Sequence, residues 1–308
     1  MNLTSQYVAN PRVKKSYSNS NATYQTIQSS YSKIRLNETR EWLRPNRGRK
    51  VSFDVSGITF KMIICPKGTF TMGSDIKGDN NPKRLVSIDR SFLLGETEVT
   101  QELFEKVMGF NPSYYQGYKY SNSNKRPVEN VTWYDAVMFC NKLSERCKKN
   151  PYYNILNVEY RQKKESENIK RAIVTTNPQA NGFRLPLAKE WEYAAKAGTE
   201  NKWAGTNDKN KVGEVAWFID NSKIKGDDED RTFPVKGKRP NEWGFYDMSG
   251  NVWEWCWDTA DEPSVDRVTR GGGCSSGDTS LCIHYHLASK PDITWLDSGF
   301  RIASSLFK

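Results

Sequence analysis

The sequence predicts an α+β fold made of short strands, two or three helices and much loop. Apolar residues recur at helical spacing in only a few segments, whereas the last third of the chain consists of short aromatic stretches broken by Gly, Pro and Asn. No internal repeat of fixed period is present. Ten Trp, fifteen Tyr and thirteen Phe offer enough apolar surface for a core, so a wholly disordered chain is excluded.

Residues 1–50 differ from the rest of the chain in charge and in their polar composition. They hold ten basic and two acidic side chains, which is +8 of the formal +10, so the other 258 residues carry only +2. The stretch 16–32 is polar and buries too little surface to order itself. We expect a basic tail or tether, suited to an anionic membrane surface, followed by a domain at 51–308 with no nucleic-acid partner. No apolar run approaches the roughly 20 residues needed to cross a bilayer.

Strand signals begin where the tail ends. Residues 51–65 alternate apolar and polar positions and then become apolar, which predicts two strands that turn at Gly57. A segment bracketed by glycines at 68–73 and further apolar stretches within 86–98 predict more strands. Thr100 is suited to cap the start of a helix that stops at Gly109.

Two more helices are predicted further along the chain. One begins near Thr132, and the other follows Pro186 and stops at Gly198. Between them, residues 149–172 are strongly charged, and we expect a surface insertion there. The apolar face of the helix after Thr132 is expected to contain Ala136, Val137, Cys140, Leu143 and Cys147.

Several long motifs occur in a fixed order. They are GTFTMGS, RPVENVTWYDAVMFCNKLSER, GFRLPLAKEWEYAAKAG, GFYDMSGNVWEWCWD and RVTRGGG, followed by a late GFRIA. In these motifs the chain resembles the formylglycine-generating enzyme and sulfatase-modifying-factor superfamily over roughly residues 63–303. The resemblance implies a variant of the C-type lectin fold, but membership of a superfamily does not settle function.

The resemblance weakens at the residues that carry the chemistry. Enzymes of that superfamily oxidise a substrate cysteine with a pair of closely spaced cysteines that follow the glycines matching Gly271–Gly273. The matching positions here hold Ser276 and Leu281, which cannot replace thiolates. We therefore expect no catalytic residues and no redox cofactor. The alternative is an oxidase of the formylglycine-generating type that acts on protein cysteine through Cys274 and Cys282.

Residues 271–300, named here the variable region, have an unusual composition. They contain both histidines of the chain, no Glu, Gln, Met or Arg, and a single Lys. Nearly every residue present can be encoded by a codon that ends in a pyrimidine. Codons of this kind arise when the adenines of asparagine codons are replaced by other bases. In this bias the segment resembles the variable region of diversity-generating retroelement proteins of the Treponema variable protein type. The resemblance implies a receptor or adhesin, exported or at the cell surface, that binds a macromolecule such as a protein.

The side chains of the variable region fall into two predicted sets. The alternation over 282–287 predicts a strand with both histidines on one face, and three tryptophans are expected near the floor of the site. The residues expected to face inward are Leu281, Ile283, Leu287, Ala288 and Phe300, and the tryptophans are Trp253, Trp255 and Trp257. The residues expected to face the ligand are Ser275, Ser276, Asp278, Thr279, Ser280, His284, His286, Ser289, Asp292, Thr294, Trp295 and Asp297.

The segment DMSGNVWE resembles the superfamily's loop that binds structural calcium. Carried over to this chain, the metal ligands would be Asp247, Gly250, Val252 and Glu254. Carbonyl and carboxylate oxygens in a Gly-containing loop are the hard ligands that calcium prefers. The alternative is that Glu254 only satisfies backbone amides of the turn.

Overall fold

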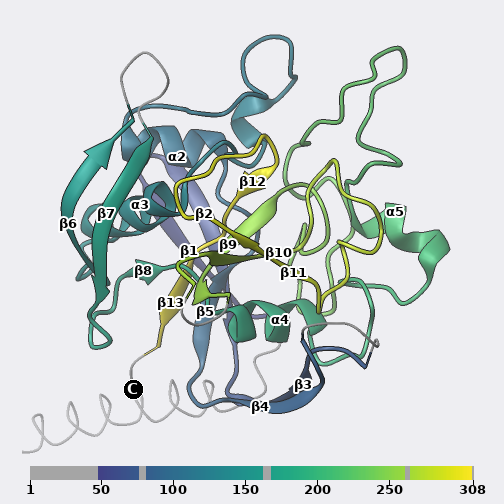
Figure 1. Ribbon diagram of the computed structural model, residues 1–308, viewed down its shortest axis with the longest axis horizontal. Helices are drawn as coiled ribbons and strands as arrows, with labels where there is room; N and C mark the ends of the chain where they lie inside the picture. The colour runs from purple at the N-terminus through teal and green to yellow at the C-terminus, as the bar shows by residue number, and fades with distance from the viewer. Residues whose placement is uncertain (1–47, 76–80, 162–167, 261–263, 307–308) are drawn as a thin grey trace, which may run out of the picture. The chain divides into compact units, whose positions relative to one another are not determined.

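The computed structural model describes residues 48–75, 81–161, 168–260 and 264–306. The predicted tail at 1–50 therefore lies almost wholly outside the described residues, and its role stays a prediction. The described part has the predicted α+β architecture, with short strands, a few helices and long loops (Figure 1). No helix in these ranges is long and apolar enough to cross a membrane.

One antiparallel sheet of five strands forms the base of the domain, in the order β1-β2-β5-β13-β8. The predicted strand pair at 51–65 is confirmed, because β1 and β2 form a hairpin in which Val55 pairs with Ile58 beside Gly57. β13, near the C-terminus, lies between β5 and β8. These strands span Lys50–Val55 (β1), Ile58–Cys65 (β2), Phe92–Gly95 (β5), Ala303–Ser305 (β13) and Phe183–Arg184 (β8).

A second sheet of four strands, in the order β11-β10-β9-β12, carries the variable region. β9 pairs antiparallel with β10 and parallel with β12, and β11 is an edge strand paired with β10. Two further hairpins are β3–β4 and β6–β7. The strands span Trp253–Thr259 (β9), Arg267–Arg270 (β10), His286–Ser289 (β11), Ser298–Gly299 (β12), Gly68–Met72 (β3), Arg84–Ile88 (β4), Tyr153–Tyr160 (β6) and Ile169–Thr176 (β7).

The three predicted helices are confirmed, and their caps explain where they start and end. The Thr100 hydroxyl accepts from the backbone N–H of Leu103 at 3.4 Å, and Gly109 ends α2 in the left-handed conformation. Thr132 and Asp135 form a capping box at the start of α3. The helices span Gln101–Met108 (α2), Trp133–Arg146 (α3), Ala188–Lys196 (α4) and a short Val212–Val215 (α5).

The charged segment at 149–172 contains regular structure that its composition did not indicate. β6 and β7 form a hairpin beside α3 in Figure 1. The hairpin is fastened at both ends, because Tyr153 at one end and Ile169 at the other are buried, and the backbone N–H of Ile169 donates to the Asp135 carboxylate at 2.8 Å. The rest of the hairpin is mostly exposed, which explains its charged sequence.

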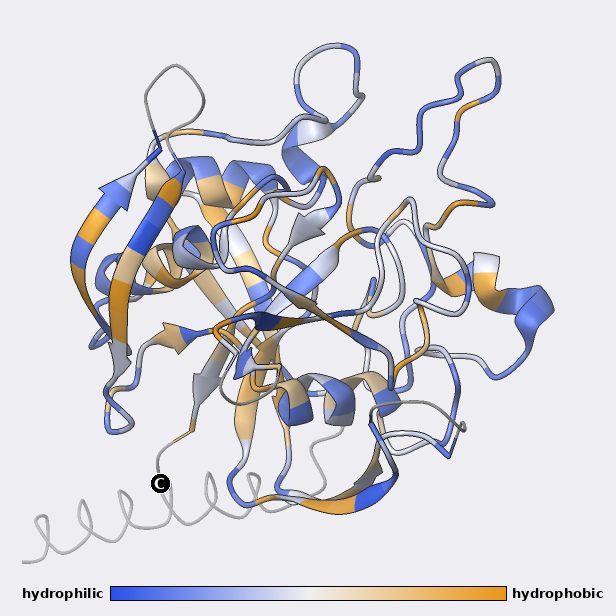
Figure 2. Cartoon of the chain, viewed as in Figure 1, coloured by the Kyte–Doolittle hydropathy of each residue, from blue (hydrophilic) through white to orange (hydrophobic). Residues whose placement is uncertain are grey.

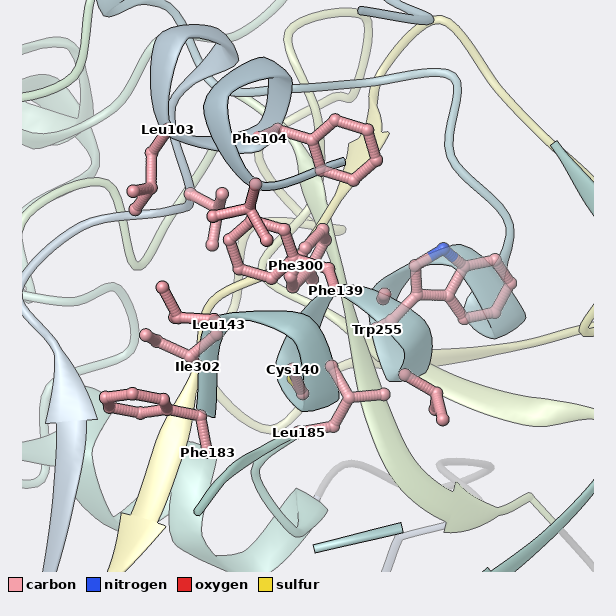
Figure 3. Packing of buried hydrophobic residues seen from close by; sticks show 14 of the residues in the cluster. Leu103, Phe104, Phe139, Cys140, Leu143, Phe183, Leu185, Trp255, Phe300 and Ile302 are labelled. Atoms are coloured by element: carbon pink, nitrogen blue, oxygen red, sulfur yellow. The ribbon is translucent and has the colours of Figure 1, made fainter. Parts of the chain in front are cut away.

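The core lies between the five-stranded sheet and helices α2 and α3. Phe104, Phe139 and Phe300 contact one another there, with Phe104 stacked on Phe139 at a ring distance of 5.4 Å (Figure 3). Burial of such rings is the main stabilising contribution to the fold. The loops at the top of the view are coloured mostly hydrophilic in Figure 2, so that end of the domain offers polar surface.

Candidate ligand-binding surface

The variable region is held to the core by buried anchor residues. Leu281, Ile283 and Phe300 are at most 1% exposed, as the sequence predicts. Backbone bonds to the preceding loop add a second fastening, because the Cys274 N–H donates to the Asn251 carbonyl at 2.8 Å. The loop between β10 and β11 is thus fixed in position although little of it is regular structure.

The twelve predicted ligand-facing side chains all keep at least partial exposure. Ser275, Thr279 and Trp295 are exposed, and Trp295 has 55% of its surface accessible. The other nine have intermediate exposure. The fold therefore leaves these positions accessible, and their contact with a ligand stays a prediction.

Two inward-facing predictions were wrong. Leu287 is 40% exposed and Ala288 is exposed, because β11 is an edge strand. The predicted strand over 282–287 is also displaced, since β11 begins at His286 and the Tyr285 N–H donates to the Cys282 carbonyl at 2.9 Å to form a turn. The two histidines consequently do not share one strand face.

The expected tryptophan floor is reduced to one residue. Trp255 is fully buried in the core and donates to the Val131 carbonyl at 3.1 Å. Trp257 stacks on Tyr153 at a ring distance of 5.0 Å, beneath the β6–β7 hairpin. Of these three tryptophans, Trp253 is the one that lies under the variable region, with its ring 6.1 Å from that of Tyr285.

Cys274 and Cys282 lack the exposed thiols that an oxidase of this type would need. Cys274 and Cys282 are each 1% exposed, and all six cysteines are free thiols. Burial raises the pKa of Cys274 well above its usual value, and the nearby Asp297 carboxyl raises it further. Such a thiol remains protonated and is a poor nucleophile.

The two positions matched to the enzymes' cysteines have structural contacts instead. The Ser276 hydroxyl accepts from the Gly273 N–H at 2.9 Å, which closes a tight turn. Leu281 is enclosed in an apolar cluster with Trp203 and Phe218. Neither side chain can supply a metal thiolate or exchange a disulfide.

Glu254 does not fit the predicted role of calcium ligand. Its Oε2 accepts from Arg301 Nε at 2.6 Å and from Trp191 Nε1 at 2.7 Å, and its Oε1 accepts from Arg301 Nη2 at 2.6 Å. A guanidinium thus already neutralises the carboxylate in the core. Within the described ranges no group of three or more His, Cys, Asp or Glu side chains is arranged to hold a metal.

The other predicted calcium ligands belong to a loop that holds the variable region. The Gly250 N–H donates to the Gly271 carbonyl at 2.8 Å, and Val252 is fully buried. Asp247 accepts from the Lys236 N–H at 2.9 Å through one oxygen, while its other oxygen is enclosed without a hydrogen-bond partner. Burial raises the pKa of Asp247 to about 6.

A tyrosine-rich loop at 112–120 extends the surface, and the sequence analysis missed it. The Asn130 side chain donates to the Pro112 carbonyl at 2.9 Å, while its backbone N–H donates to the Trp295 carbonyl at 3.0 Å. The loop therefore lies beside the variable region, with Tyr114 and Tyr118 exposed. Its sequence, PSYYQGYKY, has the Tyr, Ser and Gly content typical of antibody binding loops, which was the available signal.

The fold and the site together define a C-type-lectin-like domain of the formylglycine-generating type, in which the two positions matched to the enzymes' cysteines carry no sulfur. Residues 54–306 match the family described as sulfatase-modifying factor enzyme 1-like domain, and the chain belongs to this family.

Three relatives show the range of this family. Chaperone protein LppX of Paenibacillus barcinonensis is 37% identical over 263 residues, which cover 79% of this chain and 89% of the relative. The formylglycine-generating enzyme of Mus musculus is 28% identical over 300 residues, covering 79% and 75%. The structure of Treponema denticola variable protein 1 superimposes with a TM-score of 0.72 at 32% identity, covering 83% of this chain and 99% of that one.

Proposed function

We propose that this chain is a non-enzymatic binding protein whose variable region is diversified by a retroelement and presented to a macromolecular ligand, such as a protein. The observation that carries the proposal is the division of residues 271–300 into buried anchors and accessible positions. Leu281 and Phe300 are fully buried, whereas Thr279 and Trp295 project into solvent. Side chains of the second kind can change without disturbing the core.

The comparisons and the thiols support the same conclusion. Treponema denticola variable protein 1 is described by name as variable, and the present chain matches nearly its whole length. The formylglycine-generating enzyme of Mus musculus is less similar in sequence, at 28% identity, and the only thiols near the enzymes' cysteine positions are buried here. An exported or cell-surface location would suit such a receptor, with the basic tail as a tether to an anionic membrane surface.

Library selection would test the binding function. The full-length chain would be displayed with the twelve accessible variable-region positions randomised and selected against a panel of purified proteins. We expect many members to fold and different sequences to be enriched by different targets. A matched library at exposed positions of α2 and α3, including Glu105, Lys106 and Glu145, should fold but yield few binders. Equal enrichment from both libraries would contradict the proposal.

A conversion assay separates the binding protein from the oxidase alternative. The wild-type chain and Cys282→Ser would be incubated aerobically with a cysteine-containing peptide and a thiol reductant, and the peptide's cysteine would be followed by mass spectrometry. We expect no conversion by either protein, because Cys274 and Cys282 are both buried and burial raises the pKa of Cys274. Turnover by the wild type that is lost in Cys282→Ser would establish the oxidase instead.

A further inference from the structure

A buried guanidinium without a hydrogen-bond partner lies beside the proposed binding surface. Arg126 is 2% exposed, and its Nε and Nη1 atoms are enclosed with no hydrogen-bond partner. Buried cations are normally paired, because removing an unpaired charge from water is unfavourable. Burial is the main cause that lowers the pKa of Arg126, and the like charge of Arg231 adds to it, while Tyr120, Cys274 and Glu129 act in the opposite direction. Buried polar groups normally have a hydrogen-bond partner, so the unbonded Nε and Nη1 atoms of Arg126 require an explanation.

Aromatic rings lie close to the guanidinium without pairing its N–H groups. The Tyr120 ring lies 5.7 Å and the Phe233 ring 5.4 Å from the central carbon of Arg126. Aromatic rings at these distances favour the cation but accept no hydrogen bonds from its in-plane N–H groups. Nη2 is not among the enclosed unbonded atoms. Because Nε and Nη1 are enclosed, Nη2 is the atom at which an anion can approach the guanidinium.

Neighbouring cations already have counterions. Arg231 forms ion pairs with Asp227 and with Glu229, the second at 3.4 Å. Lys119 pairs with Glu229 at 3.0 Å. The carboxyl group nearest to Arg126 in the chain, Glu129, forms no ion pair with it within the described residues. Burial raises the pKa of Glu129 to about 8, so this group is largely neutral near pH 7.

The site adjoins the variable region and the tyrosine-rich loop. Cys274, near the start of the variable region, is close enough to Arg126 to interact with it electrostatically. The Tyr115 N–H donates to the Glu129 carboxyl at 2.9 Å, which fixes the tyrosine-rich loop above this group. Arg126 is therefore a constant element at the edge of a surface whose other side chains vary.

We propose that Arg126 is a fixed carboxylate receptor within the binding surface, which takes an aspartate or glutamate side chain of the protein ligand. The inference rests on the proposed function and specifies its ligand class: acidic side chains supply a common anchor, and the variable region selects among proteins that present one. Asp230 and Asp297 lie near Cys274, and on that side of the site their negative charges would repel a phosphate dianion more strongly than a carboxylate. Arg is also among the residues that most often dominate binding energy at protein interfaces.

Acetate provides a minimal probe of this site. Thermal unfolding of the full-length protein would be measured in potassium acetate, in potassium chloride of equal ionic strength, and with added acetamide as the neutral analogue. We expect acetate alone to raise the melting temperature in a saturable way, since binding to the folded state stabilises it. Arg126→Lys keeps the charge but loses the planar fork, and should weaken acetate binding at least about tenfold.

Controls make each result decisive. Arg239→Lys, at an exposed arginine paired with Glu214 at 3.5 Å, should respond to acetate like the wild type. If Arg126→Lys does not fold, the wild-type Nε–H resonance of Arg126, followed by NMR during acetate and acetamide titrations, gives the same answer. No acetate effect, an equal effect in Arg126→Lys, or stabilisation by inorganic phosphate but not acetate would overturn the inference. Acetate binding at Arg126 together with failed library selection would leave the receptor intact and refute the proposed display function.

Discussion

Replacing an anchor of the variable region should cost far more stability than replacing an accessible neighbour two positions away. Leu281 is fully buried in a cluster with Trp203, Val212 and Phe218, so Leu281→Ala removes packed methyl groups and leaves a cavity. Such changes cost about 2–5 kcal/mol. Thr279 is exposed, and Thr279→Ala should change the free energy of unfolding by about 0.5 kcal/mol or less.

Urea unfolding followed by tryptophan fluorescence would measure both effects on the full-length protein. In a domain of this size each kcal/mol corresponds to roughly 2–4 °C in melting temperature, so Leu281→Ala should melt about 4–20 °C lower. An unchanged slope of free energy against urea would show that the variants unfold from the same native state. The reasoning would be refuted if the two variants lost similar stability, because the variable region would then not be divided into anchors and accessible positions.

Three further predictions concern the frame of the surface. The pKa of Glu129 is raised to about 8, so the folded protein keeps a proton that the unfolded chain releases near pH 4.5. The stability that this group contributes is therefore present at low pH and falls as the pH rises to about 8. Glu129→Gln should flatten that part of a plot of unfolding free energy against pH, measured by urea unfolding. Arg301→Met should cost about 3–5 kcal/mol in the same assay, because it leaves the Glu254 carboxylate buried and unpaired. Gly250→Ala should lower the melting temperature sharply, because the added Cβ would lie 2.2 Å from the Trp217 carbonyl oxygen.

Matched substitutions on the surface separate these effects from general fragility. Lys209→Met breaks an exposed ion pair with Asp278 at 2.9 Å and should leave the urea midpoint almost unchanged. Gly226→Ala shares the positive φ of Gly250 but meets nothing within 4 Å, so only the backbone strain of about 1–2 kcal/mol should remain. If either control were as damaging as its buried counterpart, the assigned causes would be wrong.

Local signals predicted the fold well where the structure depends on them. Thr100, Thr132 and Gly109 act within one helical turn, and their helices begin and end as predicted. The hairpin at Gly57 likewise depends on a short turn between alternating residues. The buried anchors Leu281 and Phe300 could be predicted because apolar residues in a polar segment usually face a core.

Features that depend on distant partners could not be predicted in the same way. Glu254 was expected to bind calcium, but Arg301, 47 positions later, and Trp191, 63 positions earlier, occupy its carboxylate. Leu287 was expected to face inward, but its strand lies at a sheet edge, and edge position is set by the topology. The Nε and Nη1 atoms of Arg126 likewise lack partners because of the residues packed around them, such as Phe233, and no local sequence pattern predicts this.

The central claim is that this chain is a constant scaffold for a diversified surface at residues 271–300. Sequencing its coding region across isolates tests this most directly. The account predicts that substitutions concentrate between Gly273 and Phe300, at codons of accessible residues such as Thr279 and Trp295, with a near-identical template repeat at the same locus and unchanged codons for Leu281. Substitutions spread evenly along the gene, with no template repeat, would contradict it.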